Sequence, residues 1–331
     1  MSRVFRFGAG CLSELGEVAA ELGFERLALV TSRRGAELAA RLPVASVYAG
    51  VRSHAPVETV AEAAAAADGC DAIVGLGGGS AVDTAKAVSA QSGQPVIGVP
   101  TTYAGAEWTP FFGVRDEARR VKGGGSGARI AAALYDPELT LGLPPAETAG
   151  TAMNALAHCA EALYHPARTA ASDRHAFCGA RTIAYALPLV LVDGSDLYAR
   201  TRLLEGAMRA AMALGDSGLC LGHAMAQALG GRYGVAHGAA NAICLAPALR
   251  FNAEVAPEAL ETLADAMGTD DVVAKVDELA RLGGFERLRD LGVPENELDE
   301  VAVAAAERGG AKANPRPASP AEIAELYRGV W

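Results

Sequence analysis

The chain lacks any excess of positive charge. Its 331 residues include 29 lysines and arginines against 39 aspartates and glutamates, a formal net charge of −10. Nucleic-acid-binding surfaces are basic, so we expect no nucleic-acid partner. No apolar run approaches the roughly 18 residues that span a bilayer, and the start, MSRVFRFGAGCLSELG, has no signal-peptide core. We therefore expect a cytoplasmic protein with no membrane partner.

Paired cysteine motifs and internal repeats are missing as well. The six cysteines are scattered along the chain, at Cys11, Cys70, Cys159, Cys178, Cys220 and Cys244. This pattern is typical of buried thiols in a reducing compartment rather than of a disulfide framework. What the chain does have is length, since 331 residues suffice for two domains and a sizeable core.

The first part of the chain alternates short apolar strands with helices. Strands are expected at 27–31, 44–48, 72–74 and 95–99, and helices at 36–42, 57–67 and 81–90. Such alternation predicts a doubly wound, mostly parallel α/β sheet of the Rossmann-like kind. The glycine-rich stretch 122–127 is expected to be a mobile hairpin loop.

After a divide near 141–147, helical periodicity takes over. Helices are expected near 148–164, 170–191, 196–213, 218–229, 255–267, 272–282 and 296–308. We therefore predict an α/β dinucleotide-binding domain at 1–145 and an all-α domain at 146–331.

A glycine turn follows the strand that begins at Ala72. The sequence DAIVGLGGGSAVDTAK passes from an apolar run through three glycines to a helix, with Ser80 placed to cap it. Backbone N–H groups at such a helix start bind phosphate or pyrophosphate, and glycine lets the ligand approach the backbone. A merely flexible turn is the alternative. Farther on, Thr101 and Thr102 follow the strand at 95–99, at the sheet edge where open α/β sheets bind ligands.

Three of the six histidines lie in apolar, glycine-bearing segments. Asn154 and His158 stand four residues apart in TAMNALAHCAEALY, which puts them on one helix face. His223 and His237 follow in LGHAMAQALGGRYGVAHGAANA. A single histidine in such a segment is typical of the core, whereas three in two segments favour a shared site.

Several segments together resemble one enzyme family. They are GGGSAVDTAK (77–86), PTTYAGAEWTPFFGV (100–114), YDPELTLGLP (135–144), MNALAHCAEALY (153–164) and the C-terminal NPRPASPAEIAELYRGVW. These segments are similar to the iron-containing alcohol dehydrogenase superfamily, which shares its fold with dehydroquinate synthase. Within it, the resemblance is closest to the maleylacetate reductases.

The resemblance implies NADH or NADPH as cofactor and a homodimer formed through the N-terminal domain. The implied cofactor-binding residues are Gly77, Gly78, Gly79, Ser80, Asp83, Lys86, Thr101 and Thr102. The implied reaction sends hydride to the activated C=C bond of an unsaturated 4-oxo diacid and gives 3-oxoadipate, often in aromatic catabolism. Tyr103, His158, His223 or His237 would supply the proton. Asn154, Arg232 and Lys122 are expected to bind the dicarboxylate.

Two positions depart from the family pattern. Metal-binding members carry an aspartate where this chain has Asn154, and their three histidines match His158, His223 and His237. Asparagine is a weaker ligand for a divalent cation, so no metal is favoured, although iron or zinc on the three histidines stays open. A histidine often assigned to proton relay is replaced by Gln227. The runner-up functions are thus a metal-dependent alcohol dehydrogenase and a non-catalytic dinucleotide-binding protein.

Cofactor preference is argued from the end of the strand at 27–31. Relatives that prefer NAD usually have an aspartate near Ser32, where a carboxylate binds the adenosine ribose. Serine followed by Arg33 and Arg34 favours acceptance of the 2′-phosphate of NADPH. The alternative is that these arginines are a solvated charge at a helix start.

Overall fold

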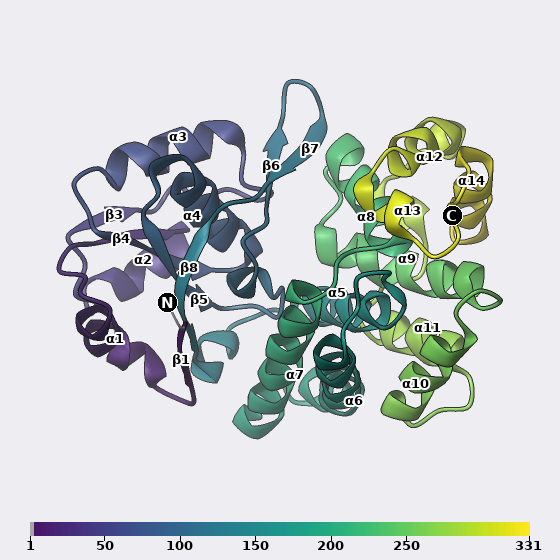
Figure 1. The fold of residues 1–331 in the computed structure, drawn as a ribbon, viewed down its shortest axis with the longest axis horizontal. Helices are drawn as coiled ribbons and strands as arrows, with labels where there is room; N and C mark the ends of the chain where they lie inside the picture. Colours follow the sequence, from purple (N-terminus) through teal and green to yellow (C-terminus); the bar gives the residue numbers. More distant parts are fainter. Residues whose placement is uncertain (1–2) are drawn as a thin grey trace. The chain divides into compact units, whose positions relative to one another are not determined.

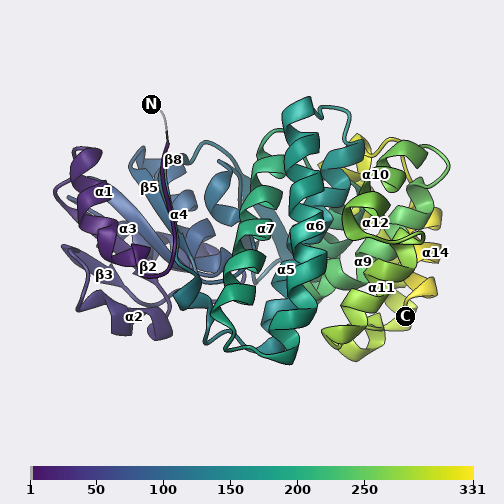
Figure 2. The same cartoon turned by 90° about the horizontal axis from the view of Figure 1, so that it is seen from below.

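The chain divides into two compact units, Met1–Gly142 and Leu143–Trp331, and the computed structural model describes residues 3–331 (Figures 1 and 2). Each unit contains its own buried apolar residues. The two units are described separately.

The first unit is built on a parallel sheet of six strands in the order β1-β8-β5-β4-β2-β3. Its strands are β1 (Val4–Phe7), β2 (Leu27–Thr31), β3 (Ser46–Tyr48), β4 (Ala72–Gly77), β5 (Pro95–Pro100) and β8 (Arg129–Tyr135). Its helices are α1 (Leu15–Glu21), α2 (Arg33–Ala39), α3 (Val57–Ala66) and α4 (Gly79–Ser92), with short 3-10 turns at Cys11–Glu14, Ala106–Trp108 and Pro137–Thr140. The predicted doubly wound parallel sheet is confirmed.

Apolar side chains that point alternately to the two sides of each strand cover both faces of the sheet. On one face Leu27, Leu29 and Val74 pack with α1. On the other face Ala28, Val30 and their neighbours pack with α3 and α4. Because side chains point to opposite faces in turn, a strand covered by helices on both sides is apolar throughout. That is why β2 is apolar from Leu27 to Val30 and buried at all five positions.

Four strands of the first unit escaped the sequence analysis. They are β1, β8 and an antiparallel pair made of β6 (Phe112–Asp116) and β7 (Val121–Gly125). The expectation of a loop at 122–127 is wrong for its first four residues, because β7 is paired there with β6 in a regular ladder. Lys122 therefore lies on a strand, opposite Arg115. Glycine-rich strands carry too little apolar signal to be recognised from composition.

The second unit contains helices α5 to α14. They are α5 (Pro145–Tyr164), α6 (Ala170–Val192), α7 (Leu197–Gly215), α8 (Leu221–Tyr233), α9 (His237–Asn252), α10 (Pro257–Met267), α11 (Val272–Leu282), α12 (Leu298–Ala306), α13 (Gly309–Ala313) and α14 (Pro320–Gly329), with 3-10 turns at Leu288–Leu291 and Glu295–Glu297. Residues 148–164 of α5 are buried with one exception, Thr151. Figure 2 shows α5, α6 and α7 side by side, and contacts join all three pairs. The predicted all-helical second half is confirmed.

One helix qualifies the statement that no apolar run suits a bilayer. Within residues 3–331, α6 alone is long and apolar enough to cross a membrane by length and composition, and 39% of its most apolar window is buried. Its exposed apolar side chains include Tyr185, Leu189 and Val192. The search for an unbroken apolar run missed this helix because polar residues interrupt it, whereas the mean hydropathy over an 18-residue window is still high.

Candidate functional site

In the first unit, the glycine turn and the two threonines lie next to each other. Strands β4 and β5 are adjacent and parallel, so their carboxyl ends meet at one edge of the sheet. The Thr101 N–H donates to the Gly77 carbonyl at 2.9 Å. A Cβ added to Gly78 would lie 3.0 Å from Thr102 Cγ2, and Gly77 has a φ of 146°. Glycine is therefore required here both for space and for backbone conformation.

The same edge offers unsatisfied hydrogen-bonding groups. Helix α4 begins after Gly78 and has no side-chain cap, so its first N–H groups are available to a ligand. Thr102 Oγ1 is buried and has no hydrogen-bond partner among residues 3–331. The Ser80 hydroxyl accepts from the His54 N–H at 3.0 Å, which corrects its expected role as the cap of α4. N–H groups at the start of α4 without a side-chain cap, together with the unpartnered Thr102 hydroxyl, are suited to binding the pyrophosphate of a dinucleotide.

Ser32 and Arg33 belong to the same edge. Ser32 is the N-cap residue of α2 and makes no side-chain cap hydrogen bond, and Arg33 is exposed. Strand β2 lies between β3 and β4, so the strand order reverses between β2 and β4. Ligands of doubly wound sheets bind at such a switch point, beyond the carboxyl ends of the strands. Ser32 and Arg33, expected at the adenosine ribose, and the glycine turn, expected at the pyrophosphate, thus lie at the carboxyl ends of the neighbouring strands β2 and β4.

Asp83 and Lys86 have a different role from the expected contact with cofactor. The Lys86 side chain is 1% exposed, and its ammonium donates to the carbonyls of Ala106 and Phe111. It also pairs with Asp83 at 3.0 Å, and Asp83 accepts from the Gly113 N–H at 3.1 Å. All three ammonium protons are used. The pair fastens the segment 106–113 to α4.

Tyr103 and Glu107 are both buried in the first unit. The Tyr103 side chain is fully buried, and its hydroxyl donates to Thr140 Oγ1 at 3.2 Å. This position does not favour Tyr103 as proton donor. Glu107, which sequence reasoning missed, is 2% exposed, and burial raises the pKa of its carboxyl. A Cβ at Gly98 would lie 2.6 Å from Glu107 Cβ, so glycine on β5 makes room for it.

In the second unit, the three predicted histidines come together. His158 on α5 and His223 on α8 have ring centroids 4.7 Å apart at an interplanar angle of 11°, and His223 lies 5.7 Å from His237 on α9. His158 Nδ1 and His223 Nε2 are buried without a hydrogen-bond partner among residues 3–331. Burial, with a smaller effect from His223, holds the pKa of His158 well below its usual value, so this imidazole is neutral.

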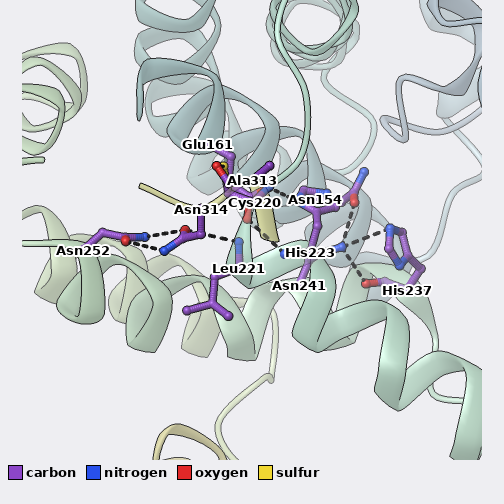
Figure 3. A network of polar contacts seen from close by, with 10 residues as sticks. All are labelled: Asn154, Glu161, Cys220, Leu221, His223, His237, Asn241, Asn252, Ala313 and Asn314. Atoms are coloured by element: carbon purple, nitrogen blue, oxygen red, sulfur yellow. Dashed lines mark hydrogen bonds and ion pairs between the residues drawn. The ribbon is translucent and has the colours of Figure 1, made fainter. Parts of the chain in front are cut away.

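Glu161 is the functional residue of this cluster that sequence reasoning missed. Its side chain is fully buried, and Oε2 lies 2.8 Å from His223 Nδ1 (Figure 3). The carboxylate also accepts from the N–H groups of Cys220 at 2.7 Å and His223 at 3.0 Å. A Cβ at Gly222 would lie 3.0 Å from Glu161 Oε1. The sequence did contain a signal for Glu161, because this acidic residue follows His158 by three positions and so lies on the same helix face.

Asn154 bonds to a second asparagine that sequence reasoning also missed. Asn241 Nδ2 donates to Asn154 Oδ1 at 2.8 Å and lies 3.1 Å from His237 Nε2 (Figure 3). The same nitrogen also donates to the His237 carbonyl at 3.1 Å, so its two protons are divided between Asn154 Oδ1 and the His237 carbonyl and Nε2. His237 and Asn241 stand one turn apart on α9, which explains their contact.

This arrangement does not fit iron or zinc as it stands. The donor atoms of Asn154 and His237 already accept from the Asn241 amide. Within residues 3–331, no group of three or more His, Cys, Asp or Glu side chains is arranged to hold an ion.

One arginine lies in the last turn of α8 and another contacts this helix from the N-cap of α13. Arg232, expected to bind substrate, pairs with Glu297 at 2.7 Å and also contacts Glu300, so its charge is already balanced by carboxylates. Arg308, which sequence reasoning missed, donates from Nη1 to Gln227 Oε1 at 3.2 Å. Gln227 therefore accepts a hydrogen bond from a guanidinium. The two carboxylates on Arg232 do not favour its expected role as a substrate ligand.

Comparison with known proteins places these two units in one family. The model described as "Iron-containing alcohol dehydrogenase" matches residues 2–137, and "Fe-containing alcohol dehydrogenase family, C-terminal" matches residues 148–331. Maleylacetate reductase 1 of Rhodococcus opacus is 33% identical over 98% of this chain and 93% of its own length.

Two solved structures show the same fold. The crystal structure of maleylacetate reductase from Agrobacterium tumefaciens superposes with a TM-score of 0.91 at 32% identity, covering 100% of this chain and 97% of that one. The structure of a 1,3-propanediol oxidoreductase gives a TM-score of 0.94 at 28% identity, covering 99% and 98% of the two chains.

Proposed function

Because the chain belongs to the iron-containing alcohol dehydrogenase family and is an oxidoreductase, we propose that it is a maleylacetate reductase. In this reaction NADH or NADPH gives a hydride to the activated C=C bond of maleylacetate. A proton completes the reduction to 3-oxoadipate, and NAD⁺ or NADP⁺ is released. Curated maleylacetate reductases 32–36% identical to this chain over most of its length support the proposal.

The observation that carries the proposal is the amide pair of Asn154 and Asn241. In a metal-dependent dehydrogenase, the position of Asn154 would offer a carboxylate to a cation. Here its oxygen accepts from the Asn241 amide at 2.8 Å, so this oxygen has a hydrogen bond without any ion. An activated C=C bond next to a carbonyl needs hydride and a proton, and imidazoles can supply the proton.

Nicotinamide dinucleotide is the cofactor of the proposal. The N–H groups at the start of α4 would bind its pyrophosphate, with Thr102 Oγ1 supplying a further hydrogen bond. Ser32 and Arg33 would face the adenosine ribose, where they favour acceptance of NADPH. When bound, the cofactor supplies the hydride.

His223 is the proton donor that the geometry supports best. Its Nδ1 lies 2.8 Å from the Glu161 carboxylate, which can hold the ring in one orientation and stabilise its positive form. Its Nε2 is the atom that can carry a proton to the substrate. His158, held neutral by burial, and Tyr103, bonded to Thr140, are weaker candidates.

A metal-dependent alcohol dehydrogenase is the second candidate function. The observation in its favour is that three imidazoles gather in one buried cluster. Three neutral nitrogens and a water make a workable catalytic zinc site, but here the Asn241 amide would have to leave His237. The proposal also includes a cytoplasmic homodimer that acts on a small-molecule substrate in aromatic compound breakdown.

Steady-state assays test the proposal. Purified protein is mixed with NADH or NADPH and either maleylacetate or a panel of aldehydes and ketones, and cofactor oxidation is followed at 340 nm, a wavelength set by the reduced nicotinamide. We expect turnover with maleylacetate and 3-oxoadipate as product. Turnover confined to aldehydes or ketones would favour the alcohol dehydrogenase, and cofactor binding without any turnover would favour a non-catalytic protein.

A further inference from the structure

A cavity in the second unit lies apart from the histidine cluster. It has a volume of about 580 Å³ and is lined by residues of α6, α7 and α10, by Gly268 and by one residue of α11. Figure 2 shows α6 between α7 and α10, and α6 contacts both. Among the residues within 3–331 that line the cavity, none lies on α5, α8 or α9, which carry the three histidines. The volume is within about 300–1,000 Å³, the range of small-molecule sites.

Aromatic side chains line much of this cavity. Phe177, Arg181 and Tyr185 follow one another at intervals of four residues on α6, so they share one helix face, and Tyr198 lies in the first turn of α7. Tyr185 and Tyr198 are 58% and 64% exposed, so the protein leaves much of both rings uncovered. Met267, which is buried, adds an apolar floor. A flat ring bound here would cover these tyrosines and gain apolar and aromatic contacts.

Two of the four charged side chains that line the cavity are already paired. Arg202 of α7 contacts Glu205, one turn farther along the same helix. Lys275 of α11 lies 3.0 Å from Glu278. The two carboxylates do not themselves line the cavity, but they balance the charges of Arg202 and Lys275. Neither cation therefore needs a ligand.

The other two charged side chains, Arg181 and Asp265, are exposed and belong to different helices, α6 and α10. Neither side chain makes a hydrogen bond or an ion pair with any of residues 3–331. The cavity thus offers one unpaired cation and one unpaired anion. A ligand with charge of one sign alone would be attracted by one of them and repelled by the other, whereas a zwitterion is attracted by both.

We propose that this cavity binds an aromatic α-amino acid. The guanidinium of Arg181 donates to the carboxylate of the ligand, for which its planar fork is suited, and the ammonium of the ligand donates to the Asp265 carboxylate. The ring of the ligand lies against Tyr185 and Tyr198. The inference goes beyond the proposed function and does not rest on it, because none of the residues given a part in the reduction lines this cavity.

Ligand-observed NMR titration of the full chain with L-phenylalanine tests the proposal. Three probes each lack one recognised group: phenethylamine has no carboxylate, 3-phenylpropionate has no ammonium, and glycine has no ring. Arg181→Gln and Asp265→Asn each remove one charge from the cavity. Arg174→Gln on α6 and Asp270→Asn after α10 are the matched controls, since both residues are exposed and neither lines the cavity. Circular dichroism checks that each variant is folded.

We expect wild-type protein to bind L-phenylalanine at one site per chain, and each probe at least about tenfold more weakly, the scale of a lost hydrogen bond to a charged group. Arg181→Gln should raise the Kd of L-phenylalanine about tenfold or more without weakening phenethylamine, which has no carboxylate to lose. Asp265→Asn should do the same to L-phenylalanine without weakening 3-phenylpropionate. Both control variants should keep the wild-type Kd within about twofold.

Three results would overturn the proposal. The first is wild-type protein that binds no L-phenylalanine up to the solubility of the amino acid. The second is a folded Arg181→Gln or Asp265→Asn that binds it with the wild-type Kd, because the ligand would then lie elsewhere on the chain. The third is equal affinity of wild-type protein for L-phenylalanine and for either singly charged probe. Should one variant be unfolded, the probe that lacks the matching charge decides on wild-type protein.

Discussion

At the scale of single residues, we propose that Ser32 sets how the first unit binds the adenosine end of the cofactor. It caps α2 at the carboxyl end of β2 without making a side-chain cap hydrogen bond. A carboxylate at this position would bind the ribose hydroxyls of NADH and repel a 2′-phosphate. Serine next to the exposed Arg33 does neither, so the proposal includes acceptance of NADPH.

Ser32→Asp should therefore shift the preference towards NADH. We expect kcat/KM for NADPH to fall about tenfold or more, because the new carboxylate is close to the 2′-phosphate, while kcat/KM for NADH changes little or rises. Ser32→Ala is the matched control and should leave both values within about threefold. A wild type that already rejects NADPH would refute the cofactor prediction.

At the scale of elements, the start of α8 is organised by side chains from other segments. Cys220, its N-cap residue, makes no side-chain cap hydrogen bond. Instead the Glu161 carboxylate of α5 accepts from the N–H groups of Cys220 and His223, and Asn314 Oδ1 accepts from the Leu221 N–H at 3.4 Å. Only Glu161 also contacts the His223 ring. Glu161 and Asn314 thus both cap the start of α8, and Glu161 in addition orients the His223 imidazole.

Replacing each of these caps should separate the two tasks. Glu161→Gln should lower kcat about 10- to 100-fold, because an amide no longer fixes the His223 ring as a carboxylate does, with the KM for NADPH unchanged. ¹⁵N NMR should show His223 protonated at Nδ1 in the wild type and a changed tautomer balance in the variant.

Asn314→Ala is the control for lost hydrogen bonding at the start of α8 without loss of a contact with His223. Because it also removes the two hydrogen bonds between Asn314 and the buried Asn252, it should lower the unfolding free energy by at least about 1–3 kcal/mol, and it should leave kcat and the His223 signals unchanged. A Glu161→Gln variant with wild-type kcat and a wild-type His223 spectrum would contradict the orienting role.

At the scale of the whole molecule, the sequence predicted architecture better than detail. Period and composition identified β2, β4 and β5 and most helices of the second unit, because buried strands and long apolar helices have strong local signals. The β6–β7 pair, β1 and β8 were missed. Short or glycine-rich strands such as β1 and β7 are stabilised by pairing rather than by their own residues, whereas the alanines of β8 give little strand signal although the strand is seven residues long. The histidine cluster was anticipated, but Glu161, Asn241 and Arg308 were not. Their roles come from contacts between segments that are far apart in the chain.

Buried neutral histidines should make the second unit sensitive to acid. Burial lowers the pKa of His158, and to a smaller degree those of His165 and His175. Below about pH 6.5 the unfolded chain binds protons that the folded chain does not, so stability falls as pH falls. The slope should reach at most about 1.4 kcal/mol per pH unit for each such proton. Urea unfolding between pH 7.5 and 5 should show this slope, and His158→Gln should flatten it. A pH-independent unfolding free energy would contradict the buried neutral state.

The most direct test of the whole account is the reduction of maleylacetate by protein of known metal content. Purified protein is analysed for iron and zinc, treated with a chelator, analysed again, and assayed with NADPH and maleylacetate. We expect chelated protein, free of stoichiometric metal, to produce 3-oxoadipate at the rate of untreated protein. Loss of activity on chelation, with one iron or zinc per chain beforehand and recovery on adding the metal back, would contradict it and make His158, His223 and His237 the metal ligands.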